Sequence, residues 1–541
     1  MDEFDYVIVG GGSAGCVLAS RLSEDPSVSV ALLEAGPPDS SVLIRVPAGI
    51  AAIARARTAS EGFDTVPQPG LKGRRGWQPR GRTLGGSSSI NAMCYVRGHP
   101  SDYDGWAAAG NPGWGWTDVL PYFLRAERNE RGASAWHGGN GPLNVADVLE
   151  PNPFSHRFVE AAEAAGIPRN DDFNGPSQEG AGFYQVTQKG GERFSAARAY
   201  LEPARGRPNL AVLTGASVER VGLEGGAATH VVARVGGQAR TLRARREVLL
   251  CAGAFHSPAI LMRSGIGPGA LLRERGVAVV HDLPGVGENL HDHPDVILVA
   301  NAPGAYDLFG QSPRGAWRLL QGVRQWRAER RGMLTTNFAE AGAFVRTDPS
   351  EPIPDLQLHF VIAKLVDHGR KAVPGHGFSV HACVLRPRSR GRVRIAGPDP
   401  SAAPEIDPNF LADPDDAARL VRGVRLVRRI IGQPSLARYG TESKTSAAMC
   451  TDDEIEDWVR RTADTIYHPV GTCRMGPGPE AVVDARLRVH GVRRLRVVDA
   501  SVMPAIVGGN TNAPTIMIGE KASDMVREDA RRSVDAVAEA G

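Results

Sequence analysis

The chain has 541 residues, enough for two or three domains of usual size. Its hydrophobic content of 42% and charged content of 23% are those of an ordinary globular protein, and its net charge of +3 is too small to indicate a nucleic-acid binder. No apolar run reaches the roughly 18 residues of a membrane-spanning helix. None of the six cysteines forms a C-x-x-C pair, which argues against a zinc site, a disulfide framework and a dithiol reductase.

The first half of the chain alternates predicted strands and helices. Apolar and periodic segments predict, in chain order, a strand at 4–9, a helix at 14–23, a strand at 28–33, a helix at Asn152–Gly166, strands at 209–221 and 229–251, and a helix at 257–276 opened by Pro258. The stretch 40–135 is rich in Gly, Pro, Arg and Trp, which predicts loops with short helices.

The second half has a different pattern. Alternating apolar and polar residues between 355 and 396 predict a mostly antiparallel sheet. The segments 413–431 and 452–464 are amphipathic with acidic starts, which predicts helices. A strand at 494–499 and a helix at 513–528 complete the chain. The two patterns together predict two interleaved domains rather than two separate ones.

The first predicted strand and helix enclose a glycine-rich loop. Gly10-Gly11-Gly12-Ser13-Ala14-Gly15 fits G-x-G-x-x-G, and Glu34 ends the next strand about 20 residues on, as the dinucleotide fingerprint requires. Glycines let the backbone approach a pyrophosphate, the helix N-terminus supplies N–H donors, and Glu34 can accept from ribose hydroxyls. The pattern predicts a dinucleotide site but does not separate NAD from FAD.

Three further segments carry a family resemblance. The first is G-R-T-L-G-G-S-S-S-I-N at 81–91, and the second is G-A-F-H-S-P at 253–258 with S-G-I-G at 264–267. The third joins H-P-x-G-T at 468–472, V-D-A-S at 498–501 and G-N-T-N-A-P-T at 509–515. In this order the chain resembles the glucose–methanol–choline (GMC) oxidoreductases, and most of all their bacterial choline-dehydrogenase-like and sorbose-dehydrogenase-like alcohol dehydrogenases.

The resemblance implies an α/β fold with FAD between two domains. A Rossmann-like FAD-binding domain would be interleaved with an α+β substrate domain built on a mostly antiparallel sheet. The expected FAD-binding segments are 1–155, 205–300 and 465–541, and the expected substrate-domain segments are 156–204 and 301–464. Some relatives attach FAD covalently through a histidine in the first signature, where this chain has Ile90. Because Ile90 has no nucleophile, we expect non-covalent FAD.

The resemblance also implies individual contacts with FAD. The ADP half would lie against Gly10, Gly12, Gly15 and Glu34, with Val218 beside the adenine. The flavin ring and ribityl chain would lie along Gly86, Ser87, Asn91 and Ala92, with Asp499, Ala500 and Ala513 on the other side. Further cofactor contacts are implied for Ser13, Ala14, Ala35, Arg82, Leu84, Met93, Ala252, Tyr467 and Asn512.

The implied proton acceptor is His468, with Asn512 as its partner across the alcohol. Oxidising an alcohol removes a hydride from carbon and a proton from oxygen, and ionising an alcohol of pKa about 16 at pH 7 costs roughly 12 kcal/mol. A positioned base typically contributes about 10²–10⁴-fold, and histidine suits this role because its pKa is near neutrality. Outside these motifs, a histidine before Pro469 and an asparagine in N-T-N-A-P would be ordinary turn residues. Phe338, Glu340 and Tyr467 are predicted walls of the substrate pocket.

Several alternatives remain at this stage. His291 and His293 in N-L-H-D-H-P look like metal ligands, but their spacing suits a loop and we predict no metal; His256 is predicted to be structural. A nicotinamide dehydrogenase would explain only the first 35 residues, and a flavin-binding scaffold without catalysis would leave His468 idle. The electron acceptor is expected to be quinone-like, with an oxygen-using oxidase of aryl or furfuryl alcohols as the alternative. We expect a cytoplasmic location, leave peripheral membrane contact open, and predict neither the alcohol nor the oligomeric state.

Overall fold

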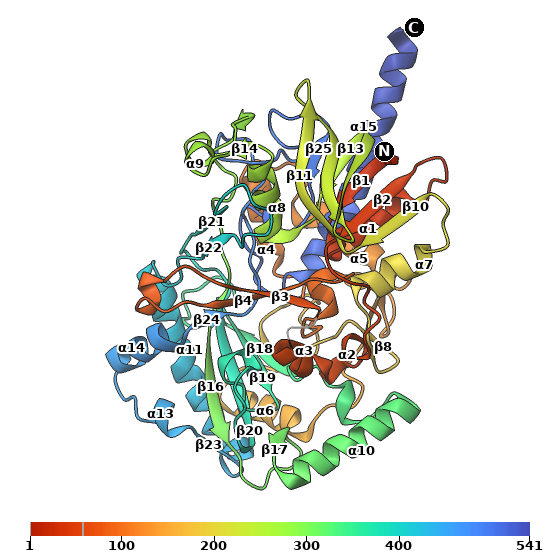
Figure 1. Ribbon diagram of the computed structural model, residues 1–541. Helices are drawn as coiled ribbons and strands as arrows, with labels where there is room; N and C mark the ends of the chain where they lie inside the picture. Colours follow the sequence, from red (N-terminus) through yellow and green to blue (C-terminus); the bar gives the residue numbers. More distant parts are fainter. Residues whose placement is uncertain (1, 57–58, 541) are drawn as a thin grey trace.

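The computed structural model describes residues 2–56 and 59–540, which form two large sheets, one in the upper and one in the lower half of Figure 1, and several two-stranded ones. The strands of the upper sheet are β1 (Asp2–Val9), β2 (Val30–Glu34), β10 (Leu210–Thr214), β11 (Ala216–Glu224), β12 (Ala227–Val235), β13 (Gln238–Leu250) and β25 (Leu495–Val497). Their order is β10-β2-β1-β13-β12-β11, with β25 beside β13. Strands β10, β2, β1 and β13 are parallel, whereas β11, β12 and β13 form an antiparallel meander. This is the Rossmann-like arrangement that the sequence predicts.

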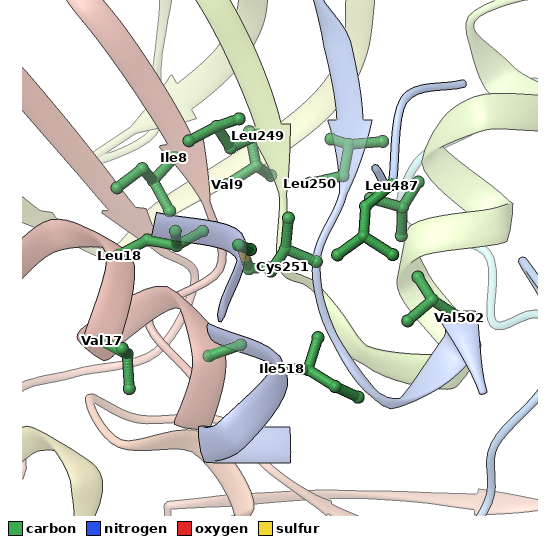
Figure 2. Close-up of a cluster of buried hydrophobic side chains, with 14 of the residues drawn as sticks. Ile8, Val9, Val17, Leu18, Leu249, Leu250, Cys251, Leu487, Val502 and Ile518 are labelled. Atoms are coloured by element: carbon green, nitrogen blue, oxygen red, sulfur yellow. The ribbon is translucent and has the colours of Figure 1, made fainter. Parts of the chain in front are cut away.

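Two helices bring distant parts of the chain together beside this sheet. Helix α1 (Ser13–Leu22) packs against α15 (Asn512–Ala540), and the two approach closely because Gly519 lies against Ala14 and Val17. Figure 2 shows the buried cluster in which these helices meet the strands. It includes Ile8, Val9, Val17, Leu18, Leu249, Leu250, Cys251, Leu487, Val502 and Ile518. This packing places the N-termini of α1 and α15 next to each other.

The lower sheet is antiparallel. Its main strands are β7 (Gly180–Phe183), β16 (Pro294–Asn301), β18 (Ala341–Val345), β19 (Leu356–Val361), β20 (Gly375–Val384) and β23 (Thr441–Glu442), in the order β23-β16-β20-β19-β18-β7. Helices α6 (Pro153–Ala164) and α11 (Pro414–Ile431) pack on it. Leu356, Leu358 and Phe360 of β19 join the apolar cluster that contains these helices. Because side chains alternate along a strand, Gln357 and His359 occupy the opposite, polar face.

The remaining elements are short or peripheral. The helices are α2 (Val42–Arg45), α3 (Ile50–Ala56), α4 (Pro100–Ala108), α5 (Trp116–Ala126), α7 (Glu202–Ala204), α8 (Gly253–Arg263), α9 (Gly269–Glu274), α10 (Pro313–Glu329), α12 (Pro434–Ala437), α13 (Lys444–Ala447) and α14 (Asp452–Thr462). The strands are β3 (Ser60–Asp64), β4 (Trp77–Gly81), β5 (Glu127–Asn129), β6 (Leu143–Val145), β8 (Gln188–Lys189), β9 (Glu192–Arg193), β14 (Ile266–Gly267), β15 (His281–Asp282), β17 (Gly310–Gln311), β21 (Arg392–Arg394), β22 (Glu405–Asp407) and β24 (Asp464–Thr465).

Three predicted elements differ from the structure. The expected strand 209–221 is two strands separated by Gly215, and 229–251 is two strands separated by Gly236 and Gly237. All three glycines have positive φ values, which permit the tight turns. The single helix expected at 257–276 is wrong. Helix α8 begins earlier, contains Pro258, and ends before Gly265, whose φ of +80° stops it; β14 and α9 follow.

The fold class is confirmed, as is the mostly antiparallel sheet between 355 and 396. The C-terminal helix is longer than the predicted 513–528. No helix among the described residues is long and apolar enough to cross a membrane. The boundaries of the two interleaved domains stay a prediction.

Candidate active site

The glycines between β1 and α1 are required for different structural reasons. Gly10 has a φ of +102°, and a Cβ added there would lie 2.5 Å from the carbonyl oxygen of Cys251. A Cβ at Gly15 would collide with the carbonyl of Gly10. At Gly12, apart from its chain neighbours, the nearest atom to an added Cβ would be the Cys251 oxygen at 3.8 Å. Gly10 and Gly15 are therefore required by the protein's own packing, whereas Gly12 borders open space of the kind a pyrophosphate needs.

Glu34 at the end of β2 fixes this loop. Its Oε2 accepts from the Gly11 N–H at 2.9 Å, and its Oε1 accepts from the Gly36 N–H at 2.8 Å. The carboxyl is buried, and desolvation raises its pKa above the usual range. Each oxygen keeps a second acceptor position, so the expected contact of Glu34 with a ribose stays a prediction. Ala35 follows it directly in the chain.

The loop of the first family signature lies directly on the glycine-rich loop. The Gly85 N–H donates to the Gly11 carbonyl at 2.7 Å, and a Cβ added at Gly86 would lie 2.8 Å from the Gly12 Cα. Two segments that are about 75 residues apart in sequence therefore border the same space, since only glycine permits so close an approach.

Asn91 in this loop is held by an arginine that the sequence analysis missed. Its Oδ1 accepts from the Met93 N–H at 3.0 Å and from Arg193 Nη1 at 2.8 Å. The Arg193 guanidinium is buried, its Nη2 has no hydrogen-bond partner, and no carboxylate within the described ranges pairs with it. A buried cation without a counter-charge is costly, so it favours an acceptor group bound beside this loop. Arg193 lies in no motif, and nothing in the sequence singled it out.

His468 is buried in the loop that follows β24. Its Nδ1 lies 3.1 Å from Nδ1 of His293, and its Nε2 lies 3.2 Å from Nδ2 of Asn510. Burial, with a contribution from the neighbouring His293 and His359, lowers the pKa of His468 well below its ordinary value. The ring is therefore neutral at pH 7.

The hydrogen bonds around His293 determine which nitrogen of His468 carries its hydrogen. His293 Nε2 lies 3.1 Å from the Val507 carbonyl, which can only accept, so His293 carries its hydrogen on Nε2. Burial lowers the pKa of His293 to about 3, so the ring is neutral and its Nδ1 is an acceptor. The hydrogen between the two Nδ1 atoms therefore belongs to His468. Its Nε2 is unprotonated, as a general base requires, and its lone pair accepts from Asn510 Nδ2.

In the structure the asparagine that contacts His468 is Asn510, and the expected role of Asn512 across the alcohol stays a prediction. Asn510 donates through Nδ2 to His468, and its Oδ1 accepts from Gln357 Nε2 at 3.1 Å. Asn512 is the first residue of α15, and its Oδ1 accepts from Ser13 Oγ at 2.8 Å. Asn512 therefore lies at the N-terminus of α15 beside α1, whereas Asn510, two positions earlier, contacts His468. The sequence holds both asparagines in G-N-T-N, so spacing alone did not separate them.

A buried carboxyl holds the turn that carries His468. Asp292 Oδ1 accepts from the His468 N–H at 2.8 Å, and its Oδ2 accepts from the Thr465 hydroxyl. Tyr467 between them has a φ of +77°, a strained value for a residue other than glycine. Burial raises the pKa of Asp292 to about 6. The Asp292 and Thr465 contacts stabilise the strained turn and so orient His468.

Comparison with known proteins identifies the family. Models described as GMC oxidoreductase match residues 4–295 and 387–519. An alcohol dehydrogenase [acceptor] of Pseudomonas putida is 47% identical over 98% of this chain and 97% of its own length. An oxygen-dependent choline dehydrogenase of Paraburkholderia xenovorans is 45% identical over 97% and 94%. The crystal structure of pyridoxine 4-oxidase from Mesorbium loti superposes with a TM-score of 0.87 at 35% identity, covering 97% of this chain and 99% of that one.

The chain belongs to the GMC oxidoreductase family. It is an FAD-dependent oxidoreductase, and the family match leaves the nicotinamide alternative without support. The residues present fit that cofactor. Gly12 borders open space at the N-terminus of α1, and Arg193 offers an unpartnered buried donor beside Asn91.

The other cofactor positions expected in this GMC oxidoreductase surround the same loops. Asp499 accepts from the Gly253 N–H at 2.8 Å and from the Ser257 hydroxyl, so it holds the start of α8 rather than offering a free carboxylate. The backbone N–H of Ala252 donates to Ser257 Oγ. Val218 is buried on β11, and Leu84 and Ala513 are buried in the main core. Ser87 Oγ accepts from the Gly81 N–H, and Arg82 lies beside Glu61. Ala500 precedes Ser501 in the chain. Direct FAD contact for each stays a prediction.

The predicted pocket walls of the GMC oxidoreductase are engaged within the protein. Glu340 is buried and accepts from Thr336, Ser155 and the Asn152 N–H. Phe338 packs on Phe309 with ring centres 4.7 Å apart, and the Tyr467 hydroxyl lies 2.6 Å from His368 Nδ1. Their contact with substrate remains a prediction.

The remaining candidate residues of this GMC oxidoreductase are His256, His293 and the cysteines. His256 pairs with Glu61 at 3.2 Å, and all six cysteines are free. The residues that the structure describes hold no group of three or more His, Cys, Asp or Glu that could bind a metal ion. His293 lies in a loop, as predicted, and contacts His468, and the polar face of β19 reaches the site through Gln357.

Proposed function

We propose that the protein oxidises the CH–OH group of an alcohol to an aldehyde or ketone, with His468 as the proton acceptor. The observation that carries this proposal is the hydrogen-bond chain from the Val507 carbonyl through His293 to His468, which leaves His468 Nε2 unprotonated. Bound FAD supplies the acceptor of the hydride. The names of the relatives at 47% and 45% identity, an alcohol and a choline dehydrogenase, support the same reaction class.

His468 and Asn510 have different proposed roles toward the hydroxyl group of the alcohol. His468 Nε2 and Asn510 Nδ2 are 3.2 Å apart, so an alcohol oxygen to one side of the pair would lie within hydrogen-bond distance of both. His468 takes the hydroxyl proton at Nε2, and its Nδ1–H continues to donate to His293. Asn510 donates a hydrogen bond to the oxygen as negative charge develops on it, since Gln357 fixes the amide orientation. An asparagine does this without competing for the proton.

For the electron acceptor, we infer a quinone-like molecule, because the relative at 47% identity is named an alcohol dehydrogenase [acceptor]. An oxidase that uses oxygen is the second candidate, favoured by the 35% identical pyridoxine 4-oxidase. We do not infer a choline substrate from Glu340, a buried carboxyl that accepts three hydrogen bonds within the protein.

One experiment tests both the reaction and the acceptor. The FAD-loaded protein is mixed anaerobically with a panel of aliphatic, benzylic, furanic, polyol and choline substrates, and loss of flavin absorbance is followed. The reduced protein is then exposed to a soluble quinone or to oxygen. We expect rapid bleaching by at least one alcohol and faster reoxidation by the quinone; no bleaching by any alcohol would contradict the reaction class, and faster reoxidation by oxygen would favour the oxidase.

The FAD is proposed to be non-covalent, because Ile90 stands where a linking histidine would be. Acid precipitation should release all of the yellow cofactor into the supernatant, and flavin retained on the denatured chain would contradict this.

A further inference from the structure

Helix α10 has an exposed surface that the proposed reaction does not use. Among the described residues, seven large apolar side chains are exposed, and three of them, Trp317, Leu319 and Leu320, lie on this one helix at 56%, 46% and 45% exposure. A fourth, Tyr306, lies just before it. Scattered apolar residues on a surface are ordinary, but a concentration of this kind marks an interaction site.

Two of these residues, Trp317 and Leu320, belong to one stripe on the helix, whereas Leu319 lies on another face, beside the hollow next to β17. In an α-helix, residues three or four apart lie on the same face, and this spacing aligns Arg314, Trp317, Leu320, Arg324 and Arg327 along the outer side of α10. The inner side is attached to the protein in two ways. Gly322 lies against Met333, and Trp326 donates from Nε1 to the Gly191 carbonyl at 2.9 Å. The stripe is therefore an outward-facing ridge, at the lower edge of the molecule in Figure 1.

The stripe is strongly basic. Residues 313–331 contain six arginines and one acidic residue, Glu329. The net charge of this segment is therefore more positive than the net charge of the whole chain, which is +3. The arginines beside the stripe are neutralised, with ion pairs from Arg318 to Asp307, Arg330 to Glu192 and Arg331 to Glu150. The stripe arginines, in contrast, have no acidic partner within residues 2–56 and 59–540. The Arg314 guanidinium lies 4.3 Å from the centre of the Tyr306 ring.

We propose that this α10 surface, comprising Tyr306, Arg314, Trp317, Leu320, Arg324 and Arg327, attaches the protein to the surface of a bilayer that contains anionic lipids. Apolar residues and arginines on one exposed helix face are the pattern of helices that lie in the membrane interface. Tryptophan and tyrosine prefer the headgroup region, and unpaired arginines are attracted to anionic headgroups.

Two features favour a bilayer over a protein partner. The three arginines of the stripe have no acidic partner among the described residues, so the charge of an anionic lipid surface would complement them. Arg314 precedes Trp317 and Leu320 on this face, and Arg324 and Arg327 follow them. Their long side chains can therefore reach headgroups while the apolar groups insert between them.

The test is vesicle flotation of the full-length, FAD-loaded protein. Vesicles of phosphatidylcholine alone are compared with vesicles that also contain phosphatidylglycerol, at low and high salt. We expect the protein to float with the phosphatidylglycerol vesicles at low salt and to be released by high salt. The double variant Arg324→Gln/Arg327→Gln should partition about 30-fold less, from about 1 kcal/mol for each arginine at such a surface. Trp317→Ala/Leu320→Ala should also lower partition, but the remainder should keep its salt dependence.

Matched variants control for charge and apolarity elsewhere. Arg220→Gln/Arg429→Gln removes two exposed arginines away from α10, and Val280→Ala trims another exposed apolar residue. These should float like the unmodified protein, and every variant should keep its flavin and its alcohol oxidation with a soluble acceptor. The proposal is overturned if the unmodified protein does not float with anionic vesicles, or if the α10 variants float equally well. It is also overturned if these variants instead dissociate a dimer on size exclusion, because the surface would then be an interface between copies.

Discussion

The two asparagines of G-N-T-N are two positions apart and contact different residues. Asn510 contacts His468, and Asn512 begins α15 and contacts Ser13 of α1. The motif predicted that an asparagine would accompany His468, but the choice between the two depends on where α15 begins. Helix boundaries are uncertain by one or two residues in any sequence-based prediction, so the structure was needed to separate a proposed substrate contact from a proposed cofactor contact.

Substitution of each asparagine by alanine should therefore change a different property of the protein. Asn510→Ala should keep its FAD but lose about 10–100-fold in anaerobic flavin reduction, because it removes a hydrogen bond to a developing charge. Asn512→Ala should change FAD affinity, since it removes the Ser13 contact between the helix N-termini. Both are measured by flavin occupancy and by stopped-flow reduction at saturating FAD. The reverse pattern would restore the original assignment of Asn512.

His293 is a positioning residue, and a conservative variant can test that. Gln in place of His293 can still accept from His468 and donate to the Val507 carbonyl, whereas Leu can do neither. His293→Leu should lose about 10–100-fold in kcat across the pH range, because the tautomer of His468 is no longer fixed and the ratio of its two neutral tautomers does not depend on pH. His293→Gln should retain most of the activity and the original profile. Equal losses in both variants would indicate a packing role only.

At the scale of elements, the sequence predicted which segments are strands and helices better than where they end. Apolar runs and glycine signals placed β1, α1, β2 and α11 within a few residues. The helix expected at 257–276 was wrong because its apolar period continues past Ser264, and Gly265 with positive φ and Pro268 interrupt it. The buried polar face of β19 was also missed, since Gln357 and His359 have meaning only once His468 and Asn510 are brought opposite them.

The loop between β1 and α1 gives a prediction at this scale. Gly12→Val should fold normally but purify without FAD, because the added side chain would enter the open space that Gly12 borders. Gly15→Val should instead fail to fold, since it collides with the Gly10 backbone. Circular dichroism and flavin absorbance of the two variants distinguish these outcomes. A Gly12→Val protein with full FAD occupancy would show that the pyrophosphate does not lie there.

At the scale of the whole molecule, the buried histidines couple stability to pH. Burial lowers the pKa of His293 and His359 to about 3, and lowers the pKa of His291 and His468 well below the usual range. In the unfolded chain each takes up a proton as the pH falls below about 6.5. Because the folded state stays neutral, its stability is complete above that pH and is lost as the pH falls.

The free energy of unfolding should fall as the pH falls below about 6.5, because the four histidines take up protons on unfolding, and the carboxyls whose pKa is raised by burial, among them Asp292 with a pKa of about 6, oppose this in part. Denaturant unfolding at several pH values measures this slope. His291→Gln provides a matched control because neither ring nitrogen of His291 has a hydrogen-bond partner among the described residues. It should reduce the slope by about 1.4 kcal/mol per pH unit, and an unchanged slope would contradict this account.

The central claim is that neutral His468 accepts the proton of the alcohol, and anaerobic flavin reduction by His468→Ala tests it most directly. Flavin occupancy is measured first, because the comparison requires FAD-loaded protein. The variant should lose about 10²–10⁴-fold in the reduction rate and should recover in part at high pH, where more of the alcohol is ionised. The unmodified protein should show a rate that is flat above about pH 6.5 and falls in acid, because burial lowers the pKa of His468. A His468→Ala protein that binds FAD and is reduced at nearly the unmodified rate would contradict the claim.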